Sequence, residues 1–133
     1  MTGVQTCALP ICKAQLLLVE DGGRLLFERR PPAGIWGGLW CLPIAEAGED
    51  PGAALRDRYG LRARAVGVLP VISHGFTHFD LKLTPLRLRV AGRVPALAER
   101  QDLRWINIAQ DSLPGLPAPV AKLLGRLRTT PGE

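Results

Sequence analysis

The sequence has no apolar run that approaches the ~20 residues of a membrane-spanning helix, which predicts a soluble protein. Cysteine is scarce, with three in 133 residues, and nothing indicates a disulfide framework, which fits a cytoplasmic protein. Acidic residues are outnumbered, since 17 Lys and Arg stand against 12 Asp and Glu, for a net charge of +5. This moderate basic excess is compatible with nucleic-acid binding and equally with an ordinary solvated surface.

Two of the three cysteines, Cys7 and Cys12, lie in the N-terminal stretch MTGVQTCALPIC. This stretch has no charged residue and no helix or strand periodicity, and it lacks the basic start and long apolar core of a signal peptide. It resembles translated sequencing-adapter sequence, so we interpret residues 1–13 as non-native and set aside a metal site at their cysteines. The remaining cysteine, Cys41, is expected to be a buried small apolar side chain.

The rest of the chain is long enough for one domain with a hydrophobic core, which we place at residues 14–128, with a tail at 129–133. Alternating or continuous apolar patterns predict a series of short strands. These lie at 14–20, 24–30, 64–73, 76–83, 85–90 and 102–108. The order of strands and helices predicts an α+β fold with a mixed sheet, a short helix and a C-terminal helix.

Turn and cap signals separate these elements. Asp21-Gly22-Gly23 is a hairpin signal between the first two strands. Asp50-Pro51 is typical of a helix start, and Gly60 marks its end. A terminal helix is predicted to start at Pro117, because apolar residues after it keep the i, i+3, i+4, i+7 spacing. The glycine-rich segment 33–43 is expected to be a loop that runs into a short strand.

The stretch SHGFTHFD, residues 73–80, lies between strand-forming sequences, and Gly75 is the expected point of chain reversal. This would place the side chains of Phe76, Thr77 and His78 at a hairpin tip, where they can meet a ligand. Packing at a strand start remains an alternative for Phe76, and an ordinary strand role remains one for Thr77. The spacing His74-x3-His78-x-Asp80 also suggests a metal site, but a bend at Gly75 argues against it.

The phrases GLWCLP and GEDPGAALRDRYGL resemble the loop–helix region of Nudix hydrolases. That family places the pattern Gly…Glu…Arg-Glu-x-x-Glu-Glu-x-Gly there, and the clustered carboxylates hold Mg²⁺ for attack on a diphosphate. Between Leu55 and Gly60 this chain has a single acid, Asp57, between Arg56 and Arg58. One carboxylate between two arginines is a poor metal cage. We therefore expect no metal ligands and no catalytic residues in this chain.

Four further phrases, ERRPPAGIWGGLWCLP, SHGFTHFDLKLTPL, RWINI and LPAPVAKLLGRL, resemble the C-terminal domain of MutY-type adenine DNA glycosylases. The resemblance covers about residues 14–128. It implies a Nudix-like fold without hydrolase activity that recognises 8-oxoguanine opposite adenine in base excision repair. The family carries a Phe-Ser-His loop at a hairpin tip, and the matching residues are Phe76, Thr77 and His78. Threonine in place of serine keeps the hydroxyl and adds a methyl group.

The resemblance implies chemistry on the N7 edge of the base. Guanine N7 is an acceptor, whereas 8-oxoguanine carries N7–H and a C8 carbonyl. A fixed hydroxyl or backbone acceptor would pair with the lesion and face another acceptor in normal guanine, a mismatch of ~1–3 kcal/mol. Further contacts with DNA or with another domain are expected from Arg29, Arg30, Trp36 and Ser73. Core or inter-domain packing remains the alternative for Trp36, and solvation for the two arginines.

The resemblance also implies what this chain does not contain. A MutY-type enzyme carries its catalytic acid and iron–sulphur cluster in an N-terminal helical domain, so no cofactor is expected here. The chain would be a fragment of a bacterial, cytoplasmic, DNA-associated enzyme, monomeric, whose partners are that domain and duplex DNA with 8-oxoguanine. A divergent Nudix pyrophosphohydrolase is the alternative enzyme, and a Nudix-fold protein-interaction module is a third possibility.

Overall fold

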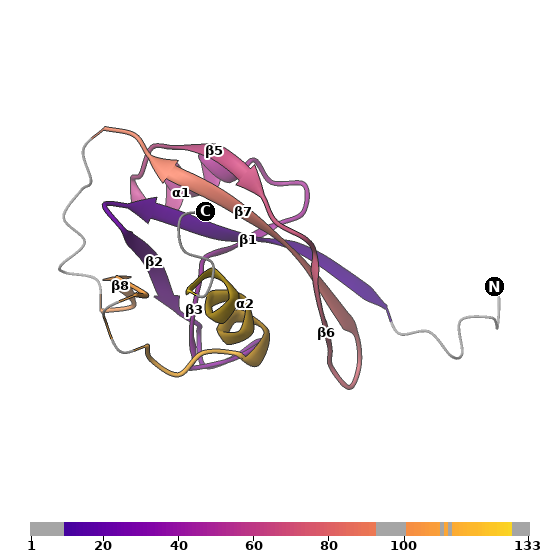
Figure 1. Cartoon of the computed structure of the whole chain (residues 1–133). Coiled ribbons are helices and arrows are strands. Elements are labelled where there is room, and N and C mark those ends of the chain that lie inside the picture. The colour runs from indigo at the N-terminus through magenta and orange to yellow at the C-terminus, as the bar shows by residue number, and fades with distance from the viewer. Residues whose placement is uncertain (1–9, 93–100, 110, 112, 129–133) are drawn as a thin grey trace.

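The structure is a computed structural model that describes residues 10–92, 101–109, 111 and 113–128. The predicted tail at 129–133 lies outside the described residues. In chain order the elements are β1 (Ile11–Asp21), β2 (Arg24–Arg29), β3 (Trp40–Cys41), β4 (Ile44–Glu46), α1 (Pro51–Tyr59), β5 (Ala63–Val68), β6 (Ile72–Gly75), β7 (Asp80–Val90), β8 (Leu103–Ile106) and α2 (Ala118–Arg128). Figure 1 shows their arrangement.

The strands form one mixed sheet with the central order β3-β2-β1-β7-β5. β1 and β7 run parallel, and the other pairs, including β4 with β1, β6 with β7 and β8 with β2, are antiparallel. The predicted α+β fold, with a mixed sheet, a short helix and a C-terminal helix, is confirmed.

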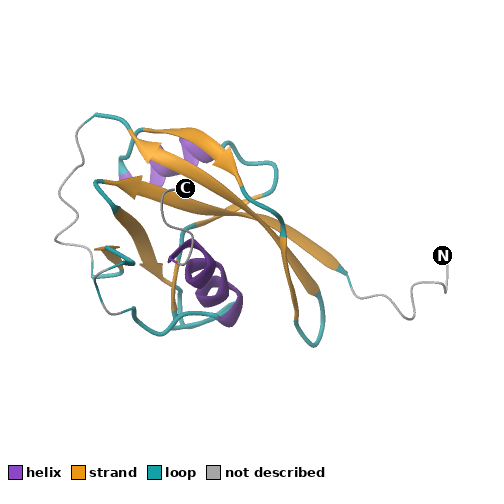
Figure 2. Cartoon of the chain, viewed as in Figure 1, coloured by secondary structure: helices purple, strands orange, loops and turns teal. Residues whose placement is uncertain are grey.

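The two helices cover opposite faces of this sheet, α2 in front and α1 behind in Figure 2. Successive residues of β1 alternate between the two cores. Leu16 and Leu18 pack in the cluster that contains α2, whereas Leu17 and Val19 pack in the cluster that contains α1. All four are fully buried. A continuous apolar run is the pattern expected of a strand that is covered on both faces.

Local signals set the ends of α1 as predicted. The Asp50 side chain accepts a hydrogen bond of 2.9 Å from the amide of Ala53, and Gly60 closes the helix in the left-handed region at φ 68°. Leu55 and Tyr59 share its buried face. None of the helices in the described ranges is long and apolar enough to cross a membrane.

β1 begins at Ile11, before the predicted start at residue 14, and its first residues pair with the start of β7. Ile11 lies opposite Asp80, and Lys13 lies opposite Lys82. The amide of Asp80 also donates to the carbonyl of Pro10 at 2.8 Å. These positions therefore have a structural role in the sheet, while the interpretation of residues 1–13 as non-native stays a prediction.

The prediction of two separate strands at 76–83 and 85–90 is wrong, because β7 is continuous through Pro85. The carbonyl of Pro85 accepts a hydrogen bond of 2.9 Å from the amide of Leu69, in the gap between β5 and β6. The N–H and C=O of one strand residue point to the same side. The donor that proline lacks therefore faces this gap instead of β1, which makes proline tolerable here.

Cys41 is fully buried, as predicted, and burial raises the pKa of its thiol from 9.0 to about 12. The neutral thiol therefore contributes stability that is complete below pH 9 and is lost as the pH rises toward 12. We expect the denaturant concentration at the unfolding midpoint of the wild type to decrease as the pH is raised from 8 to 10. Cys41→Ala should start lower, because it leaves a cavity, but should fall less over this interval. Equal falls in both proteins would contradict this assignment.

Candidate functional site

The candidate site is the tip of the β6–β7 hairpin, which projects from the sheet beside α2 (Figure 1). Gly75 lies opposite Asp80, and the amide of Phe76 donates to the carbonyl of Phe79 at 2.8 Å. The reversal is therefore formed by the four residues from Phe76 to Phe79. The prediction that the chain turns at Gly75 is wrong, since Gly75 is the last residue of β6.

The corrected turn leaves Thr77 and His78 at its centre, and both are exposed. Among the described residues, Trp36 is the non-glycine residue with a positive φ, so neither Thr77 nor His78 adopts the left-handed backbone. This matters for threonine, because a β-branched side chain is disfavoured in that region. The backbone of this tip therefore accepts threonine as readily as serine.

An aromatic cluster, formed by Trp36, His74, Phe76 and Phe79, supports the base of the tip. The rings of Phe76 and Phe79 stack with centroids 4.7 Å apart, and His74 meets Phe76 edge-on at 4.8 Å. Trp36 lies 5.7 Å from Phe76 and 5.8 Å from His74. Phe76 is half-buried in this cluster, so its ring supports the tip, while the hydroxyl and imidazole beyond it are presented to solvent.

Trp36 belongs to the loop between β2 and β3, which is tied down by its own hydrogen bonds. The amide of Arg30 donates to Leu39 at 2.7 Å, and the amide of Leu39 donates to Trp36 at 3.1 Å. Trp36 itself has a φ of 54°, a conformation that costs a non-glycine residue about 1 kcal/mol or more. A loop that holds this conformation fixes the indole against the hairpin.

The other residues expected at the site are divided between two places. Ser73 lies on β6 and accepts a hydrogen bond of 3.0 Å from Lys82 Nζ, next to the aromatic cluster. Arg29 and Arg30 instead line a separate recess of about 650 Å³, together with Arg58 of α1. Arg29 Nε donates to the carbonyl of Gly38 at 3.2 Å, which ties it to the same loop that carries Trp36.

The helix that carries the carboxylates in Nudix hydrolases has other contacts here. Asp57 is 74% exposed and lies 3.8 Å from Arg56, and Arg58 pairs with Glu49 at 3.1 Å. Within the described part of the chain, no group of three or more His, Cys, Asp and Glu side chains could hold a metal ion. His74 and His78 are therefore not members of such a group, and His74 packs in the aromatic cluster. In the described residues, the acids in and before α1 are therefore not gathered into a group that could hold a cation.

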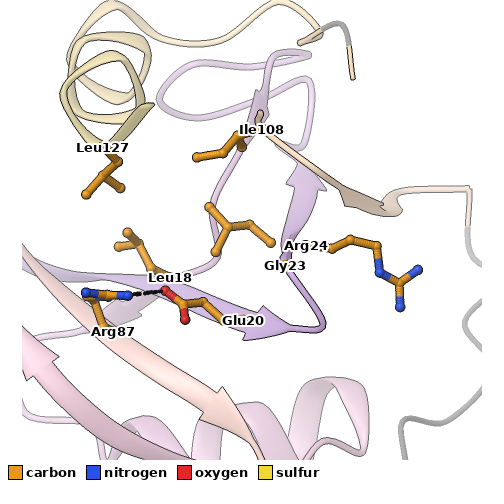
Figure 3. Close-up of a pocket in the computed structure, with 8 residues that line it drawn as sticks. Leu18, Glu20, Gly23, Arg24, Arg87, Ile108 and Leu127 are labelled. Atoms are coloured by element: carbon orange, nitrogen blue, oxygen red, sulfur yellow. Dashed lines mark hydrogen bonds and ion pairs between the residues drawn. The ribbon is translucent and has the colours of Figure 1, made fainter. Parts of the chain in front are cut away.

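A second cavity, of about 240 Å³, lies where the β1–β2 hairpin meets the end of α2 (Figure 3). Its walls are mostly apolar, and Leu18 and Leu127 approach each other across it. An ion pair between Arg87 and Glu20, 2.9 Å long, closes one side. Its volume is below the ~300 Å³ at which small-molecule pockets begin, and none of the predicted site residues lines it.

Sequence reasoning missed His74 and Phe79 as supports of the tip and Lys82 as the partner of Ser73. The spacing contained this information. A turn whose two central residues are Thr77 and His78 pairs Phe76 with Phe79 and Ser73 with Lys82. Placing the reversal at Gly75 concealed these pairs.

Comparison with known proteins identifies the family. A family model described as the NUDIX domain matches residues 14–126. The adenine DNA glycosylase of Buchnera aphidicola subsp. Baizongia pistaciae is 21% identical over 120 residues, which cover 90% of this chain and 34% of the glycosylase. The chain thus spans about a third of the length of this curated relative.

Solved structures share the fold. The MutT protein from Methanosarcina mazei Go1 has a TM-score of 0.71 at 16% identity, over 94% of this chain and 98% of that one. The C-terminal domain of mouse MUTYH, solved in complex with human PCNA, has a TM-score of 0.65 at 18% identity, over 88% and 87%. The chain belongs to the NUDIX domain family, in the type that MutY-type adenine DNA glycosylases carry at their C-terminus.

Proposed function

We propose that this domain reads 8-oxoguanine opposite adenine in duplex DNA, on behalf of an adenine DNA glycosylase domain in the same enzyme. The observation that carries the proposal is the exposed pair Thr77 and His78 at the centre of a turn whose base is fixed by stacked rings. A preorganised tip meets a base edge without first losing conformational freedom, so its hydrogen bonds translate into discrimination.

The Thr77 hydroxyl is the reader in this proposal. Its oxygen accepts a hydrogen bond from N7–H of 8-oxoguanine, which normal guanine lacks. A hydroxyl that faces guanine can instead rotate and donate to N7, which is an acceptor. Discrimination between the two bases therefore requires that the proton of the Thr77 hydroxyl is already committed to a hydrogen bond in the turn. His78 adds a second polar group beside it, and the imidazole can stack on or hydrogen-bond to the neighbouring nucleotide.

A pyrophosphohydrolase is the competing function, because NUDIX relatives include hydrolases such as that from Burkholderia pseudomallei. The contacts of α1 speak against it. Arg58 and Glu49 pair with each other, Asp50 caps the helix, and Asp57 points to solvent. Hydrolysis of a diphosphate by this family requires several carboxylates on one cation.

One experiment separates the two functions. The chain is titrated at low salt with matched duplexes that contain 8-oxoguanine:adenine or guanine:adenine, and is incubated in parallel with Mg²⁺ and nucleoside triphosphates. We expect tighter binding to the 8-oxoguanine duplex and no Mg²⁺-dependent release of phosphate or pyrophosphate. Equal affinities together with Mg²⁺-dependent release would replace this proposal by the hydrolase.

A further inference from the structure

One face of β7 changes from apolar to basic along the strand. Leu81 and Leu83 pack in the cluster that contains α2, and Leu88 packs in the cluster that contains α1 on the other face. Because side chains alternate across a strand, Arg87 and Arg89 lie on the α2 side, beyond the two leucines that α2 covers. Arg89 is exposed, and Arg87 is partly exposed.

β5 adds further arginines to this side of the sheet. Arg64 lies directly opposite Arg89 in the antiparallel pair of β5 with β7, and both are exposed. The carbonyl of Arg62 continues the pairing, since it accepts a hydrogen bond of 2.7 Å from the amide of Ala91. Arg62 is two residues from Arg64, so its side chain lies on the same side of the extended chain. Together these residues form an arginine face, which consists of Arg62, Arg64, Arg87 and Arg89.

The arginine face carries more positive charge than its neighbours neutralise. Glu20 of β1 is the acid that the strand register places beside it, opposite Arg89. The carboxylate of Glu20 is already bound by Arg87, at 2.9 Å and 3.1 Å. In the described part of the chain, the side chains of Arg64 and Arg89 form no ion pair. Like charges directly opposite each other destabilise a sheet, so a bound anion would offset this repulsion.

We propose that the arginine face binds the phosphodiester backbone of duplex DNA at a distance from the lesion. The inference rests on the proposed function, and it adds a second contact that holds the duplex and does not read a base. Arginines clustered on one face are the electrostatic footprint of nucleic-acid binding. The planar guanidinium group suits this role, because it can donate two parallel hydrogen bonds to one phosphate.

The arginine face and the hairpin tip lie at opposite ends of β7 (Figure 1). β7 contains 11 residues, and a strand rises about 3.4 Å per residue, so Arg89 lies roughly 30 Å from the end of the strand that adjoins the tip. This distance is close to one turn of B-form DNA, about 34 Å. A duplex that meets both sites would therefore have its second contact about ten base pairs from the lesion.

The first test uses the full chain with Arg64→Gln and Arg89→Gln, and duplexes of about 30 base pairs, or three helical turns, with the mispair at the centre. Each variant should weaken binding to the 8-oxoguanine:adenine and guanine:adenine duplexes by the same factor, about two- to fivefold. Each should also reduce the salt slope of log K by about one. The ratio of the affinities for the two duplexes should stay that of the wild type.

Arg56→Gln is the matched control for the loss of one positive charge. Arg56 is an exposed cation on α1, which covers the opposite face of the sheet, so its loss should change neither the affinity nor the salt slope. Thermal melting checks that the variants fold. Arg64→Gln and Arg89→Gln should melt at or slightly above the temperature of the wild type, because each change removes one of two like charges that lie opposite each other.

The second test measures the distance between the two contacts. A duplex of about ten base pairs extends only about 17 Å on either side of a central mispair, at 3.4 Å per base pair. On this duplex the wild type and both variants should bind alike, since the phosphates that meet the arginine face are missing, while the preference for 8-oxoguanine should remain. A difference that persists on the short duplex would show that the arginines act beside the lesion, and would overturn the proposal.

The proposal also fails if both variants keep the wild-type affinity and salt slope on the long duplex, in which case the arginine face would serve an acidic protein instead. It fails as well if the wild type binds no duplex at low salt. Equal affinity of the wild type for the 8-oxoguanine and guanine duplexes, with the effects of the arginine variants still present, would instead refute the reading of 8-oxoguanine and leave the arginine face as a DNA contact.

Discussion

Thr77→Val is expected to reduce the preference for an 8-oxoguanine:adenine duplex over a guanine:adenine duplex by about 10- to 100-fold. Valine has nearly the shape of threonine and the same β-branched backbone preference, so the turn at Phe76–Phe79 should keep its conformation. The change removes a single hydroxyl, which is the proposed acceptor for N7–H of the lesion. In this variant the N7–H of a bound 8-oxoguanine would face a methyl group of the valine in place of an acceptor. Leaving that buried donor without a hydrogen bond is costly.

Thr77→Ser is the matched control, because it keeps the hydroxyl and removes the methyl group instead. We expect it to retain the preference of the wild type, since the tip does not require a β-branched residue. Affinities of all three proteins for both duplexes should be measured at one salt concentration, because phosphate contacts dominate the absolute values. Serine and valine variants with the same preference would show that the hydroxyl does not read the base.

Gly37→Ala is expected to lower the free energy of unfolding by about 2–3 kcal/mol, and the melting temperature by about 6–12 °C. A Cβ at this position would run into the backbone carbonyl oxygen of Pro32 and lie 2.8 Å from its carbonyl carbon. A backbone carbonyl cannot rotate out of the way as a side chain could. The loop must therefore shift as a whole, and Trp36, the preceding residue, must lose its fixed place against His74 and Phe76.

Gly48→Ala provides the control for this variant. Gly48 also lies in an exposed turn, but no atom comes within 4 Å of a Cβ built on it. Its melting temperature should stay near that of the wild type. Near-ultraviolet circular dichroism of the tryptophans should change in Gly37→Ala and not in Gly48→Ala. A Gly37→Ala protein that melts like the wild type would contradict the close approach of this loop to Pro32.

The sequence predicted those parts of the fold that depend on local chemistry. The cap at Asp50, the left-handed glycine at position 60 and the apolar spacing of α2 act within one or two turns of helix, so a short window of sequence contains the whole signal. The apolar run in β1 was equally readable, because a strand that is covered on both faces has no polar side.

Features that depend on distant partners were not predictable in this way. Pro85 looked like the start of a new strand, because proline is tolerated inside β7 only through the gap opposite it between β5 and β6. Gly75 looked like a turn because glycine permits a chain reversal. Only the pairing register of β6 with β7 shows that the chain does not reverse at this glycine. The composition of the tip was predicted, but its support by Trp36 was not, because a long stretch of intervening chain must fold before the two meet.

The proposed function places the functional groups of this NUDIX fold on another part of the scaffold than α1. The α1 region keeps its loop–helix geometry here, while its acids are engaged in a cap and an ion pair. The exposed groups lie instead at the far end of the β6–β7 hairpin, whose position is set by the long parallel pairing of β7 with β1. Under the proposed function, the surface that meets DNA is therefore this hairpin and not the α1 region.

The central claim is that the tip reads the proton on N7 of the damaged base. The most direct test compares duplexes in which adenine lies opposite 8-oxoguanine, 8-methylguanine or guanine. The 8-methyl base carries a substituent at C8 but keeps N7 as an acceptor. We predict that the chain binds 8-oxoguanine most tightly and the other two bases equally. Binding of 8-methylguanine as tightly as 8-oxoguanine would show that the tip senses bulk at C8, and would contradict the claim.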